Sequence, residues 1–599
     1  MFLSFHRAVF SRRLGYQALS AFLICILTFS SVETVLATAA DRPNVILIMT
    51  DDQGWGDFGV QGNAIIRTPN LDAMSERSAS MSNFYVCPVC TPTRAGLMTG
   101  RYNYRTRAID TYIGRAMMDP AEVTVAEVLG EAGYSTGIFG KWHLGDCYPM
   151  RAMDQGFQES LIHRGGGIAQ PSEPKANKRR YTDPILFRNG QQVETEGYCT
   201  DVYFEAALEF IEGAQKSGQP FFTYIATNAP HGPFHDVPEG LRKEYEQADM
   251  ASIIAGKPKG SRGRKEVDTL ARIAAMITNV DENVGRLFAR LDDLGLTDNT
   301  MVIFLVDNGP NSRRFVGPYR GNKGGVNEGS VRSPLWVQWP ARLKSGTLSG
   351  QISAHIDVMP TILDACGVEN DAELDGRSLL PLLEGKEVDW QERTIATQWH
   401  RGDVPERYRH FMIRDNQWKL LNNSRIAGKK VTEKPEFELY DLMVDPGETN
   451  NLAEQKPEIV ARLKAAYDRW FDDVGSTRPD NYAPPRIVIG SPKEVETTLT
   501  RQDWRSKDSG WHAGTMGHWV VTIAEAGRYE VQVILDDAST GGNIELHIGD
   551  KTLLQPAPGD SDSLLFAEVK IAAGDAVISA TQTAGGSTRG AYQVIVRLK

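Results

Sequence analysis

Two pairs of oxygen-bearing side chains stand directly after short apolar segments of the chain. They are Asp51-Asp52 and Asp307-Asn308. Hard divalent cations such as Ca²⁺ and Mg²⁺ prefer carboxylate and amide oxygens as ligands. An aspartate in such a place can also cap the next turn, so either pair alone is weak evidence of a metal. The two pairs together would supply an all-oxygen site.

Five basic residues occur in short polar motifs: Arg94 in CTPTR, Lys141 and His143 in GKWHLG, His231 in NAPHGP and Lys323 in GNKGG. Each alone has an ordinary explanation, because an isolated lysine is usually solvated and an isolated histidine is usually structural. Beside a divalent cation, the five would stabilise the charge of an oxyanion through a transition state. The two histidines could also exchange protons near neutral pH.

Cys90 is the remaining reactive residue of this set, and it lies in the string CPVCTPTR. Pro92 predicts the start of a helix, so Cys90 should stand just before a helix N-terminus, where backbone N–H groups favour anions. A redox pair with Cys87 or a zinc site would need accompanying residues that are missing here. A thiolate would be a soft ligand beside a hard cation, and this mismatch disappears if Cys90 is converted to an oxygen-bearing group.

These residues share a position relative to the predicted secondary structure. Apolar runs predict buried strands at 44–50, 134–139, 221–226 and 301–306, and periodic patterns predict helices at 124–132, 200–214 and 268–294. Strands that alternate with helices indicate an α/β domain with a large, mostly parallel sheet flanked by helices. Ligands bind beyond the carboxyl ends of such strands, and the polar motifs all lie there.

The remaining chain predicts smaller units. Residues 41–385 form the α/β domain, and residues 386–474 form a small antiparallel α+β subdomain with a final helix at 457–472. Residues 475–493 are rich in Pro and Gly and are interpreted as a linker. Alternating patterns in 494–599 predict a β-sandwich. Its Trp504, Trp511 and Trp519 could stack on sugars in a carbohydrate-binding module, or could be core residues.

Residues 1–40 have the pattern of a secretory signal peptide, with Arg7, Arg12 and Arg13 before the apolar run 19–27 and small residues at 37–39. An uncleaved anchor is the alternative. We therefore expect an exported protein, periplasmic or secreted, without stable membrane insertion after cleavage. The formal net charge of -11 argues against a nucleic-acid partner.

The motifs CTPTRAGLMTGR, DDQG, GKWHLG, APHGP and DNGP, together with ELYDLMVDPGETNNLA at 438–453, resemble the type I sulfatase family of the alkaline phosphatase superfamily, including bacterial arylsulfatases. The resemblance covers residues 42–473. It implies that a formylglycine-generating enzyme oxidises Cys90 to formylglycine, a step that a Cys87–Cys90 disulfide would block. It also implies one Ca²⁺ ion, rather than Mg²⁺, bound by Asp51, Asp52, Asp307, Asn308 and residue 90. Arg94, Lys141, His143, His231 and Lys323 match sulfate-binding and proton-transfer positions.

The expected activity is hydrolysis of sulfate monoesters, of sulfated carbohydrates or aryl sulfates. Under this hypothesis His231, assisted by Lys323, protonates the departing alcohol, and His143 takes a proton from the hydrated aldehyde at residue 90. The alternatives are a phosphatase or phosphonate monoester hydrolase of the same superfamily and an inactive glycan-binding protein. His163 and Arg164, in HRGGG, are interpreted either as a substrate-binding loop or as part of a Gly-rich turn.

Overall fold

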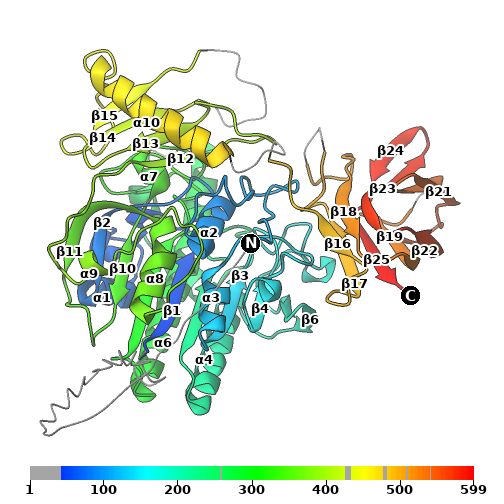
Figure 1. Cartoon of the computed structure of the whole chain (residues 1–599), viewed down its shortest axis with the longest axis horizontal. Coiled ribbons are helices and arrows are strands. Elements are labelled where there is room, and N and C mark those ends of the chain that lie inside the picture. Colours follow the sequence, from blue (N-terminus) through cyan, green and yellow to red (C-terminus); the bar gives the residue numbers. More distant parts are fainter. Residues whose placement is uncertain (1–41, 257–258, 425–433, 477–481, 507–509, 540) are drawn as a thin grey trace, which may run out of the picture. The chain divides into compact units, whose positions relative to one another are not determined.

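The computed structural model describes residues 42–256, 259–424, 434–476, 482–506, 510–539 and 541–599 (Figure 1). The expected signal peptide at 1–40 lies outside the described residues. Within the described part, no helix combines the length and the apolar character that crossing a membrane requires.

A large mixed sheet forms the centre of the α/β domain. Its strands lie in the order β11 (Leu348–Ala354), β2 (Ala79–Tyr85), β10 (Leu335–Gln338), β8 (Thr300–Val306), β1 (Asn44–Thr50), β7 (Phe221–Ala226), β3 (Ser135–Lys141), β4 (Glu159–His163), β5 (Ile185–Arg188) and β6 (Gln191–Glu194), and β9 (Arg332–Ser333) pairs with β2. The predicted strands are β8, β1, β7 and β3, which are adjacent and parallel. The predicted α/β fold is therefore confirmed. The antiparallel strands β10, β5 and β6 were not predicted.

Helices cover both faces of this sheet, which explains why β1 is apolar at consecutive positions rather than at alternate ones. Val45, Leu47 and Met49 belong to one apolar cluster, and Ile46 and Ile48 belong to another. The first cluster includes residues of α2 (Cys90–Thr99), α3 (Val125–Glu131), α8 (Val358–Cys366) and α9 (Leu380–Leu383). The second includes residues of α1 (Pro69–Arg77), α4 (Cys199–Ser217) and α6 (Gly260–Asp293). All seven residues of β1 are buried.

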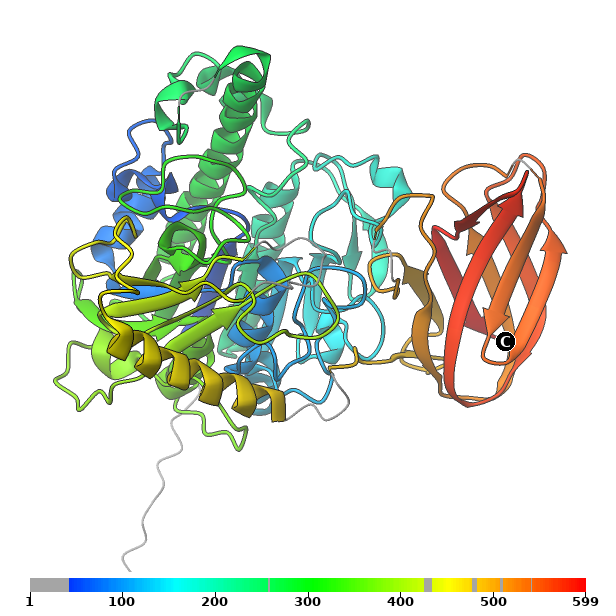
Figure 2. The ribbon, with the colours of Figure 1, turned by 90° about the horizontal axis from the view of Figure 1, so that it is seen from above.

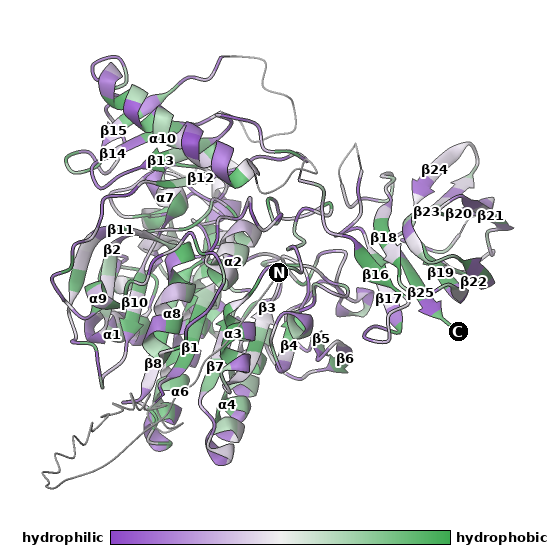
Figure 3. Ribbon diagram, in the orientation of Figure 1, coloured by the Kyte–Doolittle hydropathy of each residue, from purple (hydrophilic) through white to green (hydrophobic). Residues whose placement is uncertain are grey.

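The predicted antiparallel subdomain is a four-stranded sheet covered by a helix. The strands are β12 (Ile395–Gln398), β13 (Phe411–Arg414), β14 (Trp418–Asn422) and β15 (Glu438–Asp441). Helix α10 (Pro457–Ser476) runs across them (Figure 2). It is amphipathic, and its ribbon carries both hydropathy colours (Figure 3). Its Leu463 and Tyr467 pack against Phe411 and Ile413 of the sheet.

A buried ion network joins this subdomain to the α/β domain. The Nζ atom of Lys419, in β14, lies 2.9 Å from carboxylate oxygens of both Glu328 and Glu448. Glu328 opens the short helix α7 (Glu328–Val331), and its other oxygen pairs with Arg332 and accepts a hydrogen bond from Tyr85 of β2. Because none of the three paired side chains Lys419, Glu328 and Glu448 is more than 1% exposed, removal of one partner leaves uncompensated charge.

The C-terminal residues form the predicted β-sandwich. One sheet contains β16 (Ile487–Ile489), β18 (Trp519–Ile523), β23 (Gly574–Ala584), β20 (Asn543–Ile548), β21 (Lys551–Pro556) and β24 (Ser587–Gly590). The other contains β17 (Glu496–Thr500), β25 (Gln593–Leu598), β19 (Gly527–Ile534) and β22 (Ser563–Ile571). Strand β16 falls within the residues interpreted as a linker.

Trp504 and Trp519 are completely buried in the core of the sandwich, so neither ring is available to stack on a sugar. The same apolar cluster includes Ile113, Cys147 and Met150 of the α/β domain. The core of the sandwich is thus continuous with the surface of the α/β domain.

We predict that Lys419→Met lowers the free energy of unfolding by about 3 kcal/mol or more, because two buried carboxylates lose their shared cation. Urea denaturation followed by tryptophan fluorescence measures the change. Lys464→Met is the control, since its pair with Asp468 lies at the surface of α10 and should contribute less than about 1 kcal/mol. Equal losses in the two variants would contradict the structural role of the buried network.

Candidate functional site

The two acidic pairs meet at the carboxyl edge of the large sheet. Strands β1 and β8 pair in register up to Thr50 and Val306, so the residues that follow each strand are neighbours. The backbone N–H of Asp52 donates to Asp307 at 3.1 Å, and the side-chain amide of Asn308 donates to Asp52 at 2.8 Å. The structure therefore brings together the four oxygen-bearing residues that the sequence predicts as metal ligands.

Three cations converge on these carboxylates. Lys141, the last residue of β3, places its Nζ atom 2.6 Å from Asp51. The Arg94 guanidinium, from α2, lies 2.9 Å from Asp307, and the Lys323 Nζ atom lies 2.5 Å from Asp52. Lys141 and Arg94 are buried, whereas the side chain of Lys323 is 21% exposed. Lys323 is thus the most exposed of these three cations.

Cys90 is the first residue of α2, and its Sγ atom lies 3.4 Å from Nζ of Lys323. Ligand atoms of Cys90, Asp51 and Asp52 all lie within 4.8 Å of one another. Burial raises the pKa of the Cys90 thiol above its ordinary value, although Lys141 and Lys323 oppose this shift. The thiol is therefore protonated at neutral pH and is a poor nucleophile.

Cys87 points to a different neighbour, with its Sγ atom 3.6 Å from the Nε2 atom of His355. The five cysteines among the described residues are free thiols. Between the two thiols, the hydroxyl of Thr93 donates to the backbone carbonyl of Asp307 at 2.7 Å and accepts from the Cys87 N–H. This side chain ties the start of α2 to the end of β8.

The close packing of charged groups shifts the pKa values of Asp307 and Asp52. Burial and then the neighbouring Asp51 raise the pKa of Asp307 to about 7. Burial also acts to raise the pKa of Asp52, but Lys323 and His231 outweigh it and hold that pKa below its ordinary value. The Oδ1 atoms of Asp51 and Asn308 are buried and have no hydrogen-bond partner among the described residues. Unpaired buried oxygens beside crowded carboxylates are what a hard cation would satisfy.

The two predicted histidines lie on either side of this centre. The Nε2 atom of His143 lies 2.9 Å from the backbone carbonyl of Thr111, and its backbone has a left-handed φ of 59°. The Nδ1–H of His231 donates to the carbonyl of Gly232, which leaves Nε2 facing Asp52 at 3.8 Å. Burial lowers the pKa of His143 well below its ordinary value and that of His231 to about 4. His143 is buried, whereas the side chain of His231 is 20% exposed.

The Gly-rich segment 165–167 packs directly against both histidines. A Cβ atom on Gly166 would lie 2.8 Å from Cε1 of His143, and one on Gly167 would lie 3.0 Å from Nδ1 of His231. Glu173 shapes this segment by accepting hydrogen bonds from the backbone N–H groups of Arg164 and Gly165, each at 2.8 Å. The segment is therefore a wall of the site in which a side chain has no room.

His163 and Arg164 directly precede the Gly-rich segment in the chain. His163 is completely buried, pairs with Lys141 in the β3–β4 register, and has no hydrogen-bond partner for either ring nitrogen among the described residues. The Arg164 guanidinium stacks over Phe187 at 3.7 Å from the ring centre. Substrate binding by these two residues stays a prediction.

Sequence reasoning missed several side chains that hold the site. Arg314 is buried, forms an ion pair with Asp57 at 2.6 Å and donates to the backbone carbonyl of Asp52 at 2.9 Å. It thereby supports the left-handed backbone of Asp52, whose φ is 64°. Thr111 and Gln502 contact His143. No local motif marks these residues, since each acts through a partner that is distant in the chain.

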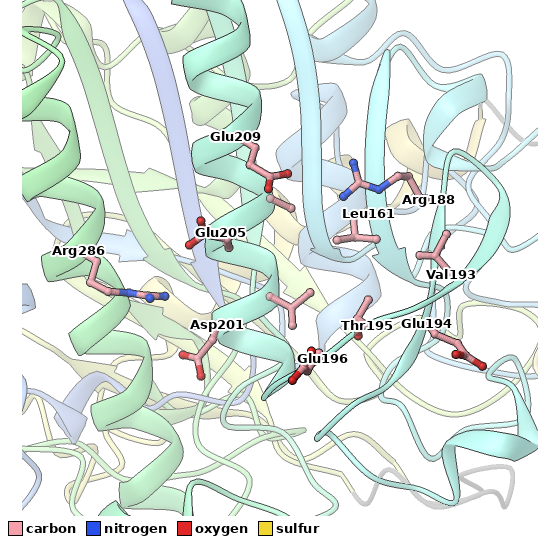
Figure 4. Close-up of a pocket in the computed structure, with 12 residues that line it drawn as sticks. Leu161, Arg188, Val193, Glu194, Thr195, Glu196, Asp201, Glu205, Glu209 and Arg286 are labelled. Atoms are coloured by element: carbon pink, nitrogen blue, oxygen red, sulfur yellow. The ribbon is translucent and has the colours of Figure 1, made fainter.

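A surface cavity of about 410 Å³ lies elsewhere, between α4, α6 and the β5–β6 hairpin (Figure 4). Acidic side chains dominate its lining, among them Glu194, Glu196, Asp201, Glu205 and Glu209. It contains none of the predicted site residues, and its charge would repel an anionic substrate.

The pKa of Glu173 predicts a pH-dependent stability. Burial raises this pKa from 4.5 to about 7, so the folded chain holds the proton over a range in which the unfolded chain has released it. The stability that this group contributes is therefore greatest at low pH and falls as the pH rises from 4.5 to 7. Glu173→Gln, which keeps an acceptor for the two N–H groups, should gain up to about 3 kcal/mol over the wild type across this range.

Urea denaturation of both proteins at several pH values tests this. Glu209→Gln, at an exposed position of α4, is the control and should show no comparable pH-dependent difference. A stability difference between Glu173→Gln and the wild type that stays constant with pH would contradict the prediction.

Comparison with known proteins agrees with this geometry. Residues 43–368 match the model of the family described as Sulfatase, and residues 322–470 match the model described as N-sulphoglucosamine sulphohydrolase, C-terminal. Human N-acetylgalactosamine-6-sulfatase is 30% identical over 508 residues, which cover 75% of this chain and 91% of that protein. The N-acetylglucosamine-6-O-sulfatase of Bacteroides thetaiotaomicron is 25% identical over 552 residues, which cover 78% of this chain and 90% of that protein.

A solved structure extends the likeness to the fold. The crystal structure of Ps i-CgsB in complex with k-i-k-neocarrahexaose superposes with a TM-score of 0.62 and 26% identity, and covers 74% of this chain and 98% of that chain. The family match spans more than half of the chain and contains Asp51, Asp52, Cys90, Asp307 and Asn308. The chain therefore belongs to the sulfatase family, as a type I sulfatase of the alkaline phosphatase superfamily and a sulfuric ester hydrolase.

Proposed function

We propose that this sulfatase is an exported enzyme that hydrolyses sulfate esters of carbohydrates, using a Ca²⁺ ion and a formylglycine made from Cys90. The main support for this proposal is that Asp51, Asp52, Asp307, Asn308 and Cys90 lie together at one edge of the sheet. Lys141, Arg94 and Lys323 form ion pairs with the three aspartates. The pattern of residues 1–40 supports export.

The donor set fits calcium. Three carboxylates and one amide offer only hard oxygen ligands, and two of these oxygens are buried without a partner among the described residues. Asp51, Asp52, Asp307, Asn308 and residue 90 would hold the ion. When bound, calcium would act as a Lewis acid on an oxygen of the sulfate ester and relieve the repulsion among the aspartates.

Residue 90 fits a converted side chain better than a thiol. Its sulfur is protonated and would be a soft ligand in a hard oxygen site. A formylglycine would supply an oxygen nucleophile in the same position, once its aldehyde is hydrated. Maturation would then need a formylglycine-generating enzyme as a partner before folding buries Cys90.

The chain's own residues divide the remaining work. Lys141 and Lys323 hold the sulfonate oxygens, and Arg94 favours the ionised form of Asp307 and holds it in place as a proton acceptor. His231 and Lys323 are each about one-fifth exposed, so the alcohol part of the substrate lies on their side. The negative charge of the bound sulfate ester raises the pKa of His231, so that Nε2 takes up a proton and delivers it to the alcohol as it leaves. His143, which is buried, acts as the base toward residue 90.

Sugar sulfates are the proposed substrate class. The named relatives act on sulfated N-acetylhexosamines, and the superposed structure contains an oligosaccharide. Within this chain, Tyr112 and Trp511 pack edge to face at 5.5 Å, and Arg401 lies over Tyr112 at 4.3 Å. Tyr112 adjoins Thr111, which holds His143, so these aromatic and basic groups lie close to the site and suit a sugar ring.

We predict that Cys90→Ala abolishes sulfate release from 4-nitrophenyl sulfate without lowering the melting temperature, because the nucleophile is lost while the fold does not depend on it. Cys366→Ala, another buried thiol, is the control and should retain activity.

Peptide mass spectrometry of the wild type should find the aldehyde at residue 90. A chelator should remove the activity of the wild type until Ca²⁺ is restored. Substantial turnover by Cys90→Ala would disprove the proposal.

Gly166→Ala should lower kcat by about tenfold or more, because the added methyl group would lie 2.7 Å from the Gln170 amide nitrogen and 2.8 Å from Cε1 of His143, and so displaces the imidazole. Gly213→Ala provides a matched control, since an added Cβ at this exposed position of α4 meets nothing within 4 Å. Steady-state kinetics on 4-nitrophenyl sulfate measures both variants. Wild-type kcat in Gly166→Ala would show that this wall does not set the position of His143.

A further inference from the structure

The C-terminal sandwich reaches the segment that holds His143. We define the docking loop as residues 501–505, between β17 and β18. The backbone carbonyl of Gln502 accepts from the N–H of Gly114 at 3.1 Å, and the Arg505 guanidinium donates to the carbonyl of Ile113 at 2.8 Å. The loop is therefore bound along residues 111–114 rather than at a single point.

The docking loop is itself firmly held. Arg501 is completely buried, and its guanidinium makes two bonds to Asp536, at 2.7 and 2.8 Å. It also donates to the carbonyl of Ala591. Trp504 belongs to the core of the sandwich. Because the loop is anchored in the sandwich, it offers a rigid surface to the α/β domain.

One carbonyl joins Gln502 to His143. The backbone carbonyl of Thr111 lies 2.9 Å from Nε2 of His143 and 2.9 Å from Nε2 of Gln502, and these two nitrogens are 3.4 Å apart. A carbonyl oxygen can only accept, so both nitrogens carry hydrogen toward it. In the neutral ring of His143 the proton thus sits on Nε2, and Nδ1 keeps its lone pair. Nδ1 has no partner among the described residues, as a general base requires.

We propose that Gln502 is a positioning residue of the active site, contributed by the C-terminal sandwich. Its amide fixes the Thr111 carbonyl and contacts the edge of the His143 ring, which sets both the tautomer and the orientation of the imidazole. The role assigned to His143 rests on the proposed function. The sandwich is then a structural part of the catalytic centre.

The test compares Gln502→Met with Gln582→Met. Methionine keeps the volume of glutamine and removes the amide, so the fold is preserved. Gln582 is the matched control: it is 1% exposed, lies in β23 of the same sandwich, and donates to Ser539 and to the carbonyl of Gly541. For Gln502→Met we expect kcat on 4-nitrophenyl sulfate to fall about tenfold with KM changed less than about twofold, since loss of one hydrogen bond is worth about that factor. Gln582→Met should keep the wild-type kcat.

A second measurement does not depend on turnover. Long-range ¹H–¹⁵N spectra of protein labelled with ¹⁵N-histidine, assigned through His143→Gln, report the tautomer of His143. The Nε2–H form should be uniform in the wild type and in Gln582→Met and mixed in Gln502→Met. Unchanged spectra together with unchanged kcat in Gln502→Met, or an equal loss of kcat in Gln582→Met, would overturn the inference. Absence of wild-type turnover would contradict the proposed function instead, and the spectra alone would then decide on Gln502.

Discussion

The site depends on the forced proximity of three aspartates at the edge of a parallel sheet. Strands β1 and β8 end side by side, so Asp51, Asp52 and Asp307 cannot avoid one another. Burial, and then the neighbouring charge of Asp51, oppose ionisation of Asp307 and raise its pKa to about 7. Each surrounding cation counters a particular carboxylate: Lys141 pairs with Asp51, Lys323 with Asp52 and Arg94 with Asp307. The oxygens left without partners define where a metal ion would complete the balance.

The histidines are placed by shape rather than by charge. The rings of His143 and His231 are both hydrogen-bonded to backbone carbonyls. Gly166 packs against His143, and Gly167 packs against His231. Glycine is needed at 166 and 167 because a Cβ atom would lie 2.8 Å from an atom of His143 and 3.0 Å from an atom of His231, respectively. The backbone at Asp52 and at His143 is left-handed. This conformation changes the direction of the chain just after strands β1 and β3, where both side chains join the site.

The two C-terminal units also take part in the site. The His410 side chain, in the antiparallel subdomain, donates to the carbonyl of Gly324 at 2.7 Å and so holds the loop that carries Lys323. Gly324 also donates to the carbonyl of Pro88, close to Cys90. From the other side, the docking loop of the sandwich reaches His143 through Thr111. A division of the chain into a catalytic domain and appendages would therefore separate groups that act together.

Local sequence patterns predicted the four central strands, the acidic pairs at their ends and the motifs around Cys90, because an apolar run followed by polar residues can be recognised without the fold. They also indicated the sandwich. The folded chain was needed to see that His163 is buried beside Lys141, that Arg164 stacks on Phe187, and that Gln502 reaches a histidine more than three hundred residues away in the chain. Such contacts follow from the way in which strands and loops that are distant in the sequence pack together, and no spacing within one segment encodes them.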